Sequence, residues 1–218
     1  ADTLPIKEPS ATLLLLAARV SAQSIPSPYR FIDEKQAGGV YAGYLFTSHG
    51  ELGLAPKNGP IFGGRYSIRL GGPFVIEAEL GYFDSSRAVL DTVVVLPDST
   101  RAQVGTANFN ALLASAGLRF NFTGPRTWHS LQPFLAFGGG GIASLTGTQP
   151  EDERVAADAR FDFGTHFAGH FGGGIEWFVS RRFTVRIDAR NVIYKINTPS
   201  GFLLGTVGAR TPGDEWLQ

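Results

Sequence analysis

The sequence has no cysteine, no methionine and few charged residues. Its 218 residues include only 17% Asp, Glu, Lys and Arg, and the formal net charge is zero. Without cysteine, neither a disulfide framework nor a thiolate metal site can form. Soluble domains usually carry about 25% charged residues, so this composition is atypical of them. A net charge of zero also provides no overall field that would attract nucleic acid.

Long apolar runs are missing as well. No stretch of about 18 apolar residues exists, which excludes a transmembrane helix. The longest apolar run is Ala11 to Ala22. It has the length of a signal-peptide core, and Val20-Ser21-Ala22 offers small residues of the kind found at cleavage sites. We therefore expect 1–22 to be a signal peptide, with a short packed N-terminal helix as the alternative.

Glycine, at 28 residues, and aromatic residues, at 12%, are abundant, and they alternate. In "FGTHFAGHFGGGIEWF", 163–178, one alternate set is mainly aromatic and apolar, and the other holds glycine, histidine and glutamate. A period of two predicts β-strands. Comparable strand-like segments occur at 39–46, 61–70, 75–83, 110–122, 131–145 and 182–194.

The connections between these segments alternate in length. Gly71–Pro73 and Val179–Arg181 are tight turns, and Thr123–Ser130 is a modest one. Long polar loops are expected near 47–60, 84–107, 146–161 and 195–215. Short turns at one end and long loops at the other indicate an antiparallel up-and-down meander.

The size of a small barrel decides which face meets water. A barrel of about eight strands has an interior that side chains just fill. The aromatic sets would overfill this space, whereas glycines, alanines and a few charges would fit. We therefore predict that the apolar sets face lipid and the polar sets face the lumen. The expected lipid-facing and girdle residues are Tyr44, Tyr66, Tyr82, Trp128, Phe171, Trp177 and Phe183.

The hairpins predict ion pairs inside the barrel. If the turn at Gly71–Pro73 is centred near Pro73, Arg69 faces Glu77 and Ser67 faces Glu79. If the last tight turn is centred within 179–181, Glu176 faces Thr184, and His170 faces Arg190 with Asp188 on the diagonal. Opposite charges at this spacing stabilise each other. The predicted lumen charge network is Arg65, Arg69, Glu77, Glu79, Arg119, His170, Glu176, Arg186, Asp188 and Arg190.

These segments resemble a known family, the small eight-stranded OmpA/OmpX-like outer-membrane β-barrels. The resemblance covers about 36–194 and rests on "LQPFLAFGGGG", "GGGIEWF" and "RFTVRIDAR". It implies an all-β, antiparallel, up-and-down transmembrane barrel that is integral to the bacterial outer membrane. It further implies that the short turns face the periplasm and the long loops face outside. The expected division is 1–22 signal peptide or helix, 23–35 periplasmic segment and 36–218 barrel.

The family closes its barrel with an eighth strand, which should begin where this sequence reads "GDEWLQ". Glu215-Trp216 resembles the start of a strand after a long loop. An open sheet would expose unpaired backbone groups to hydrocarbon. We therefore expect the last strand to be truncated, with Ala11–Ala22 as the alternative segment to fill the gap.

Candidate chemical groups in the sequence are few. His166 and His170 lie about 13 Å apart on a strand, which is too far to share a metal. His170 with Asp188 could form an acid–base pair, although both are better explained as lumen residues. His129 and Ser130 have no third partner, and the glycines at 138–141 lack the lysine and helix of a phosphate loop. No catalytic residue, metal site or cofactor is predicted.

These observations favour a non-enzymatic outer-membrane protein with a lumen plugged by charges and a structural, adhesive or loop-mediated binding role. The expected partners are outer-membrane lipid, lipopolysaccharide and an envelope or extracellular protein, with no nucleic acid. The alternatives are a lipid-modifying enzyme acting on lipid A acyl chains, a narrow pore, and a soluble ligand-binding barrel with its faces reversed.

Overall fold

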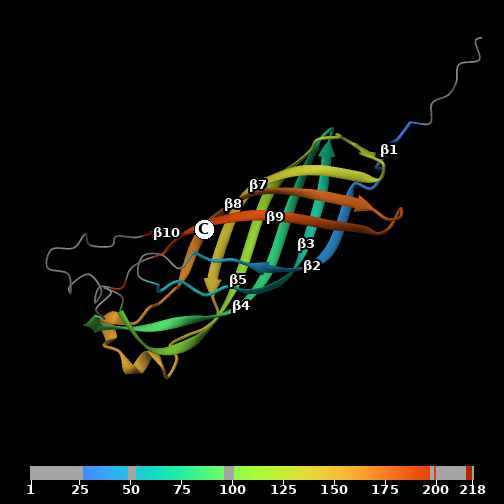
Figure 1. Ribbon diagram of the computed structural model, residues 1–218. Coiled ribbons are helices and arrows are strands. Elements are labelled where there is room, and N and C mark those ends of the chain that lie inside the picture. Colours follow the sequence, from blue (N-terminus) through green and yellow to red (C-terminus); the bar gives the residue numbers. More distant parts are fainter. Residues whose placement is uncertain (1–26, 49–52, 96–100, 197–198, 200–214, 218) are drawn as a thin grey trace, which may run out of the picture.

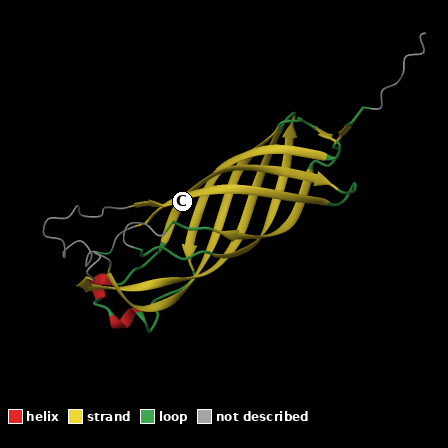
Figure 2. Ribbon diagram, viewed as in Figure 1, coloured by secondary structure: helices red, strands yellow, loops and turns green. Residues whose placement is uncertain are grey.

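A computed structural model of the chain describes residues 27–48, 53–95, 101–196, 199 and 215–217. Almost all the regular structure is strand, and the strands form one tilted, curved sheet (Figure 1, Figure 2). Two short 3-10 helices, η2 (Asp152–Arg154) and η3 (Ala157–Ala159), lie between β7 and β8. The strands are β1 (Tyr29–Phe31), β2 (Gln36–Leu45), β3 (Gly59–Gly71), β4 (Phe74–Val95), β5 (Arg101–Asn121), β6 (Arg126–Trp128), β7 (Leu131–Ser144), β8 (Thr165–Phe178), β9 (Thr184–Ile196) and β10 (Glu215–Leu217).

The sheet is an antiparallel meander in the order β10-β9-β8-β7-β5-β4-β3-β2. Each of the seven predicted strands is present, and the predicted all-β fold is confirmed. Glu215, where the sequence indicates a strand start, lies opposite Ile196 at the beginning of β10. Among the residues that the structure describes, no backbone pairing joins β10 to β2. The N-terminal apolar run lies outside the described residues.

The predicted modest turn at 123–130 contains a small strand of its own. β6 pairs with β1, with Tyr29 opposite Trp128 and Phe31 opposite Arg126. Trp128 then lies opposite Leu131 across a two-residue connection, in which His129 and Ser130 have φ of 48° and 65°. Two consecutive residues with positive φ match the type I′ turn that suits a two-residue hairpin. β1 is thereby fixed to the short-turn end of the barrel.

The long loop predicted at 84–107 is wrong, because this segment is mainly strand. β4 and β5 are 22 and 21 residues long, whereas a strand needs about 9–11 residues to cross a bilayer. Their outer halves pair from Asp84 opposite Asn110 to Val89 opposite Gly105. They extend beyond the other strands as a hairpin (Figure 1). We call the paired segments Asp84–Val95 and Arg101–Asn110 the outer hairpin.

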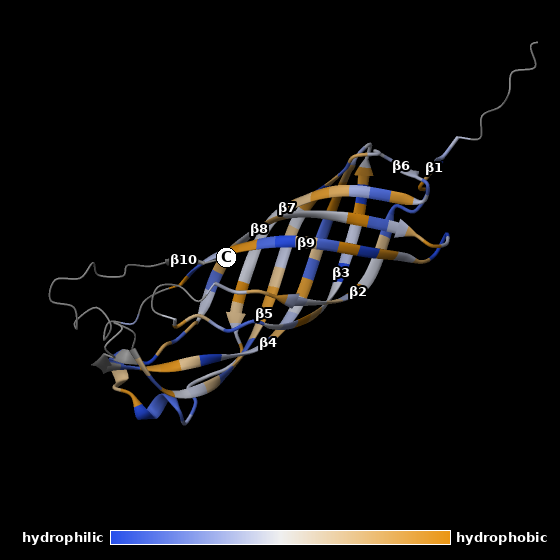
Figure 3. Ribbon diagram, viewed as in Figure 1, coloured by the Kyte–Doolittle hydropathy of each residue, from blue (hydrophilic) through white to orange (hydrophobic). Residues whose placement is uncertain are grey.

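The predicted sidedness agrees with the structure. Tyr66, Phe171 and Ile187 are 46%, 55% and 77% exposed on the outer surface, whereas Glu77 and Arg119 are 4% and 2% exposed. Figure 3 shows the alternation of hydrophilic and hydrophobic residues along β7 and β9. All seven predicted lipid-facing and girdle residues are exposed. Tyr194, near the end of β9, points inward and is buried.

The pairing predicted across the first short turn is wrong by two residues. Arg69 lies opposite Val75, Ser67 opposite Glu77, and Arg65 opposite Glu79. The turn is centred on Gly72 and not on Pro73, and a bulge lies between Arg69 and Gly71. Moving the centre of an antiparallel turn by one residue moves every pair by two. A shift of two keeps each side chain on its face, so the predicted faces remain correct.

The last short turn shows the same error. Glu176 lies opposite Arg186 and not Thr184, and His170 lies opposite Val192 and not Arg190. Asp188 lies opposite Gly174, four residues further along β8 from His170. The proposed His170–Asp188 pair is therefore not formed.

Inward-facing glycines allow the strands to approach each other closely. A Cβ atom added at Gly140 would collide with the carbonyl oxygen of Ala114, and one at Gly138 with that of Ala116. A Cβ atom added at Gly172 or Gly174 would collide with the backbone of β9 in the same way. Glycine inside a strand often marks a site where another backbone approaches closely, and the inward glycines of the run 138–141 do so here.

Two adjacent glycines of β7 test the close approach. Gly140→Ala should destabilise the folded barrel by about 1–3 kcal/mol, the usual cost of overpacking a filled interior. Gly141→Ala is the matched control, because its Cβ would meet only the His166 carbonyl oxygen at 3.8 Å. Urea titration of the refolded protein in micelles measures both. Equal stability of the two variants would contradict the close packing.

Candidate functional site

The lumen holds a first layer of charges near its short-turn half. Glu77 accepts a hydrogen bond from Arg186 Nη1 at 2.6 Å, and Arg119 Nη1 lies 3.3 Å from the same carboxylate. Arg119 also pairs with Glu176 at 3.0 Å. Both guanidinium groups also lie over the ring of Phe134, with Arg186 Cζ 4.0 Å and Arg119 Cζ 5.1 Å from its centroid. The ring therefore attracts both cations.

A second layer lies toward the long loops. Arg190 donates to Glu79 at 2.7 Å and to Asp188 at 3.1 Å. Arg65 donates to the same Glu79 carboxylate and lies 3.3 Å from Asp188. The ring of Tyr41 covers Arg65, with Cζ 5.2 Å from its centroid. Asp188 also pairs with Arg186 at 2.9 Å, which connects the two layers.

Eight of the ten predicted lumen residues join this network, and two do not. Arg69 contacts none of the carboxylates and donates to Gln132 at 3.4 Å, because the corrected register places Val75 opposite it. His170 lines the space beside Arg190 without an ion pair. Sequence reasoning missed Tyr41, Phe134 and Gln132. Tyr41 and Phe134 occupy alternate positions that face inward on their strands, so the alternation in the sequence could have identified them.

The network fills the middle of the lumen. The space between Glu77, Glu79, Ser115, His170 and Arg190 leaves no room for a water molecule. On the long-loop side, a pocket of about 960 Å³ has Arg65, Glu79 and Arg190 at its polar end. Its lining also includes Tyr44 and Ile187 from the outer surfaces of β2 and β9, so the pocket opens between these two strands.

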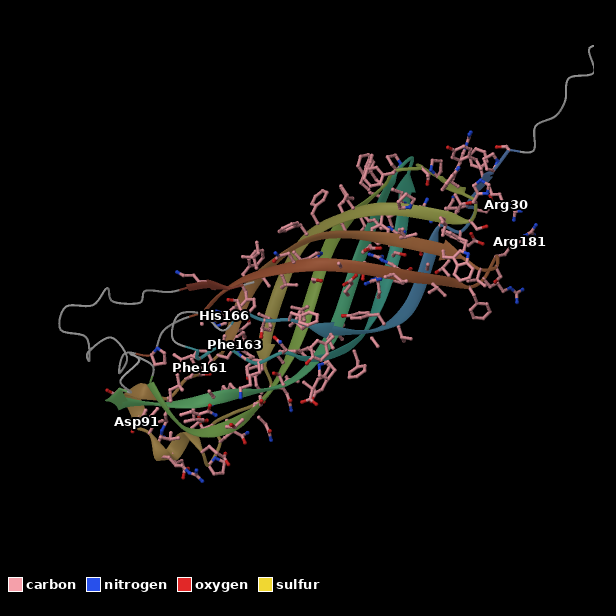
Figure 4. The ribbon with its side chains drawn as sticks, in the orientation of Figure 1. Arg30, Asp91, Phe161, Phe163, His166 and Arg181 are labelled. Atoms are coloured by element: carbon pink, nitrogen blue, oxygen red, sulfur yellow. The ribbon has the colours of Figure 1, made fainter. Side chains whose placement is uncertain are left out.

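A second cluster, missed at the sequence level, lies on the outer hairpin. Phe109 packs edge-on against Phe83 and Phe163, with ring centroids 6.3 and 5.0 Å away. The buried Arg87 donates to both carboxylate oxygens of Asp152, at 2.7 and 2.6 Å. The loop of η2 and η3 is thereby fixed to the hairpin. Figure 4 shows Phe161 and Phe163 at this end, far from Arg30. The apolar residues within the charged stretch 150–163 could have indicated that this segment packs against another part of the chain.

The remaining candidate catalytic or metal-binding side chains do not come together in one site. The ring of His166 packs on Phe163 at 4.9 Å, and that of His129 packs on Trp128 at 4.9 Å. Within the described ranges, no group of histidine and carboxylate side chains could hold a metal. No helix in the described part of the chain is long and apolar enough to cross a membrane.

Comparison with protein families identifies the class. The model of the outer membrane protein beta-barrel domain family matches residues 10–209, and the chain belongs to this family. It is an integral protein of the bacterial outer membrane, with the barrel spanning the bilayer. Comparisons with curated proteins and with solved structures find no match.

Glu77 tests the ion-pair network most directly, because three arginines surround it. Glu77→Gln keeps the shape of the side chain but removes its charge, which leaves Arg119 and Arg186 undercompensated. Removing one partner of a buried pair typically costs about 3–5 kcal/mol. Urea unfolding in micelles should show this loss, while the exposed control Glu153→Gln should stay near wild type. A Glu77→Gln barrel as stable as wild type would contradict the network's role.

Proposed function

We propose that this protein is a non-conducting, non-enzymatic outer-membrane barrel that presents its outer hairpin to a binding partner. The single observation that carries this proposal is the two-layer ion-pair network across the lumen. Four arginines and four carboxylates neutralise one another there, so the plug carries balanced charge. The barrel serves as an anchor, and the surface that remains for a partner lies outside the membrane.

The plug opposes ion flow for two reasons. The arginine and glutamate side chains occupy the space that a water column would need, and all of them except Glu176 are held by more than one partner. An ion that passed would have to separate buried pairs whose charges then lack water. The narrow-pore alternative requires a continuous water path past Arg65 and Glu79, and these two residues are paired.

The outer hairpin is suited to binding because it is folded rather than loose. Its buried aromatic cluster and the Arg87–Asp152 pair hold the two strands and the η2–η3 segment together. Polar side chains remain exposed on it, including Gln103, Thr106 and Asn108. A rigid polar surface loses little conformational entropy on binding. We propose an extracellular or envelope protein, or lipopolysaccharide, as the partner, and no nucleic acid.

The lipid-modifying alternative lacks support from the geometry. An acyl-transfer or hydrolytic centre needs a nucleophile in hydrogen-bond reach of a base that a third group orients. In the described segments, His129 and His166 make ring contacts with aromatic side chains, and no hydrogen bond joins a histidine to a serine or a carboxylate. His170, the candidate base, lies away from Asp188. The non-enzymatic role remains a proposal that an assay of lipid A acyl chains can check.

Planar-bilayer recording tests the plug. The wild-type protein should give no stable current steps at neutral pH, and the Glu77→Ala/Arg119→Ala variant should give them, because both changes remove side chains from one layer. Urea unfolding and heat-modified mobility of this double variant show whether it is folded. Sustained conductance of the wild type under these conditions would exclude the plugged barrel. It would leave the family assignment intact.

A further inference from the structure

The short-turn end of the barrel carries a collar of basic and aromatic side chains. β1 brings Arg30 and Phe31 beside β6, where Arg126 stacks on Phe31 with Cζ 4.3 Å from the ring centroid. Arg181 and Arg182 lie in the turn between β8 and β9 and are exposed. Figure 4 shows Arg30 and Arg181 at the same end of the molecule. We call Arg30, Lys35, Arg126, Arg181 and Arg182 the basic collar.

The collar has an excess of positive charge. Among the residues that the structure describes, its five cations lie near two carboxylates, Asp33 and Glu34. None of the three connections at this end, 71–73, 122–130 and 179–183, contains an acidic residue. Arg30, Arg181 and Arg182 form no ion pair with the described residues. The described residues exposed at the opposite end are mainly acidic by contrast, with Asp84, Glu153, Asp158 and Asp162 against Arg154 and Arg160.

Exposed aromatic rings place the collar at a membrane interface. Trp128 and Trp177 are 48% and 50% exposed, and Phe183 is 72% exposed, all close to the short turns. Tryptophan is enriched at the level of lipid headgroups. The arginines beside these rings therefore lie where phosphate groups lie. Guanidinium binds phosphate through two parallel N–H···O bonds, which makes arginine suited to this ligand.

We propose that the basic collar selects anionic phospholipids in the leaflet at the short-turn end of the barrel. The chemical class recognised is a phosphodiester headgroup with net negative charge. Zwitterionic lipids carry the same phosphate, but their own cation offsets it. The selection should therefore favour phosphatidylglycerol over phosphatidylcholine. It should weaken as salt screens the charges, because the collar is exposed.

Tryptophan fluorescence can measure this selection, because Trp128 and Trp177 lie beside the collar. The full chain with Trp216→Phe, which leaves these two as the reporters, is reconstituted into vesicles. The vesicles contain phosphatidylcholine and phosphatidylglycerol, with one or the other brominated to quench fluorescence. Brominated phosphatidylglycerol should quench several-fold more effectively than its bulk fraction predicts at low salt. The excess should fall in high salt.

Matched variants assign the effect to the collar. Arg126→Gln/Arg181→Gln/Arg182→Gln should reduce quenching by brominated phosphatidylglycerol to that of brominated phosphatidylcholine. Arg154→Gln/Arg160→Gln, at the other end, should keep the wild-type preference. Heat-modified mobility shows that each variant is folded. Equal quenching by the two lipids in wild type, or a preference that survives in the triple variant, would overturn the proposal.

Discussion

A strand inside a bilayer must pair every backbone N–H and C=O group with a neighbouring strand, because hydrocarbon offers no partner. The ladder provides this pairing for the strands between β2 and β9, and β10 begins the pairing of the remaining edge of β9 at Tyr194–Ile196. Once the backbone is paired, the two faces of the sheet meet different surroundings. Aromatic and branched side chains face lipid, and charged side chains turn toward the axis. The ionic lumen and the exposed rings both follow from this division.

The packing of the lumen depends on two features together, small glycines in its wall and long arginine side chains in its middle. Inward glycines, such as Gly140 and Gly172, let the wall curve tightly and leave space in the middle. Long arginine side chains fill that space and reach carboxylates on distant strands, as Arg186 of β9 reaches Glu77 of β4. A charge removed from water in this way needs more than one partner. Glu77, Glu79 and Asp188 each contact at least two arginines.

The sequence was sufficient to predict the strands, their faces and most of the lumen residues, because a period of two fixes the side of each residue. It could not fix which residues face each other, since that depends on the centre of a turn. The first short turn is centred on Gly72 rather than Pro73. The predicted partners of Arg69 and His170 were wrong because the centre of each turn was misplaced. The outer hairpin was missed because Arg87 to Leu90 is buried on both faces and shows no alternation. The Arg87–Asp152 pair joins residues 65 positions apart, which no local pattern indicates.

The sidedness of the sheet can be measured directly, because the chain has no cysteine of its own. Single cysteines at five consecutive positions of β5, from Leu112 to Ala116, can each carry a spin label in the reconstituted protein. Collision with oxygen, which concentrates in hydrocarbon, then reports lipid exposure. We expect high collision rates at 112, 114 and 116 and low rates at 113 and 115. Maxima at 113 and 115, or no alternation, would contradict the inward placement of the charges.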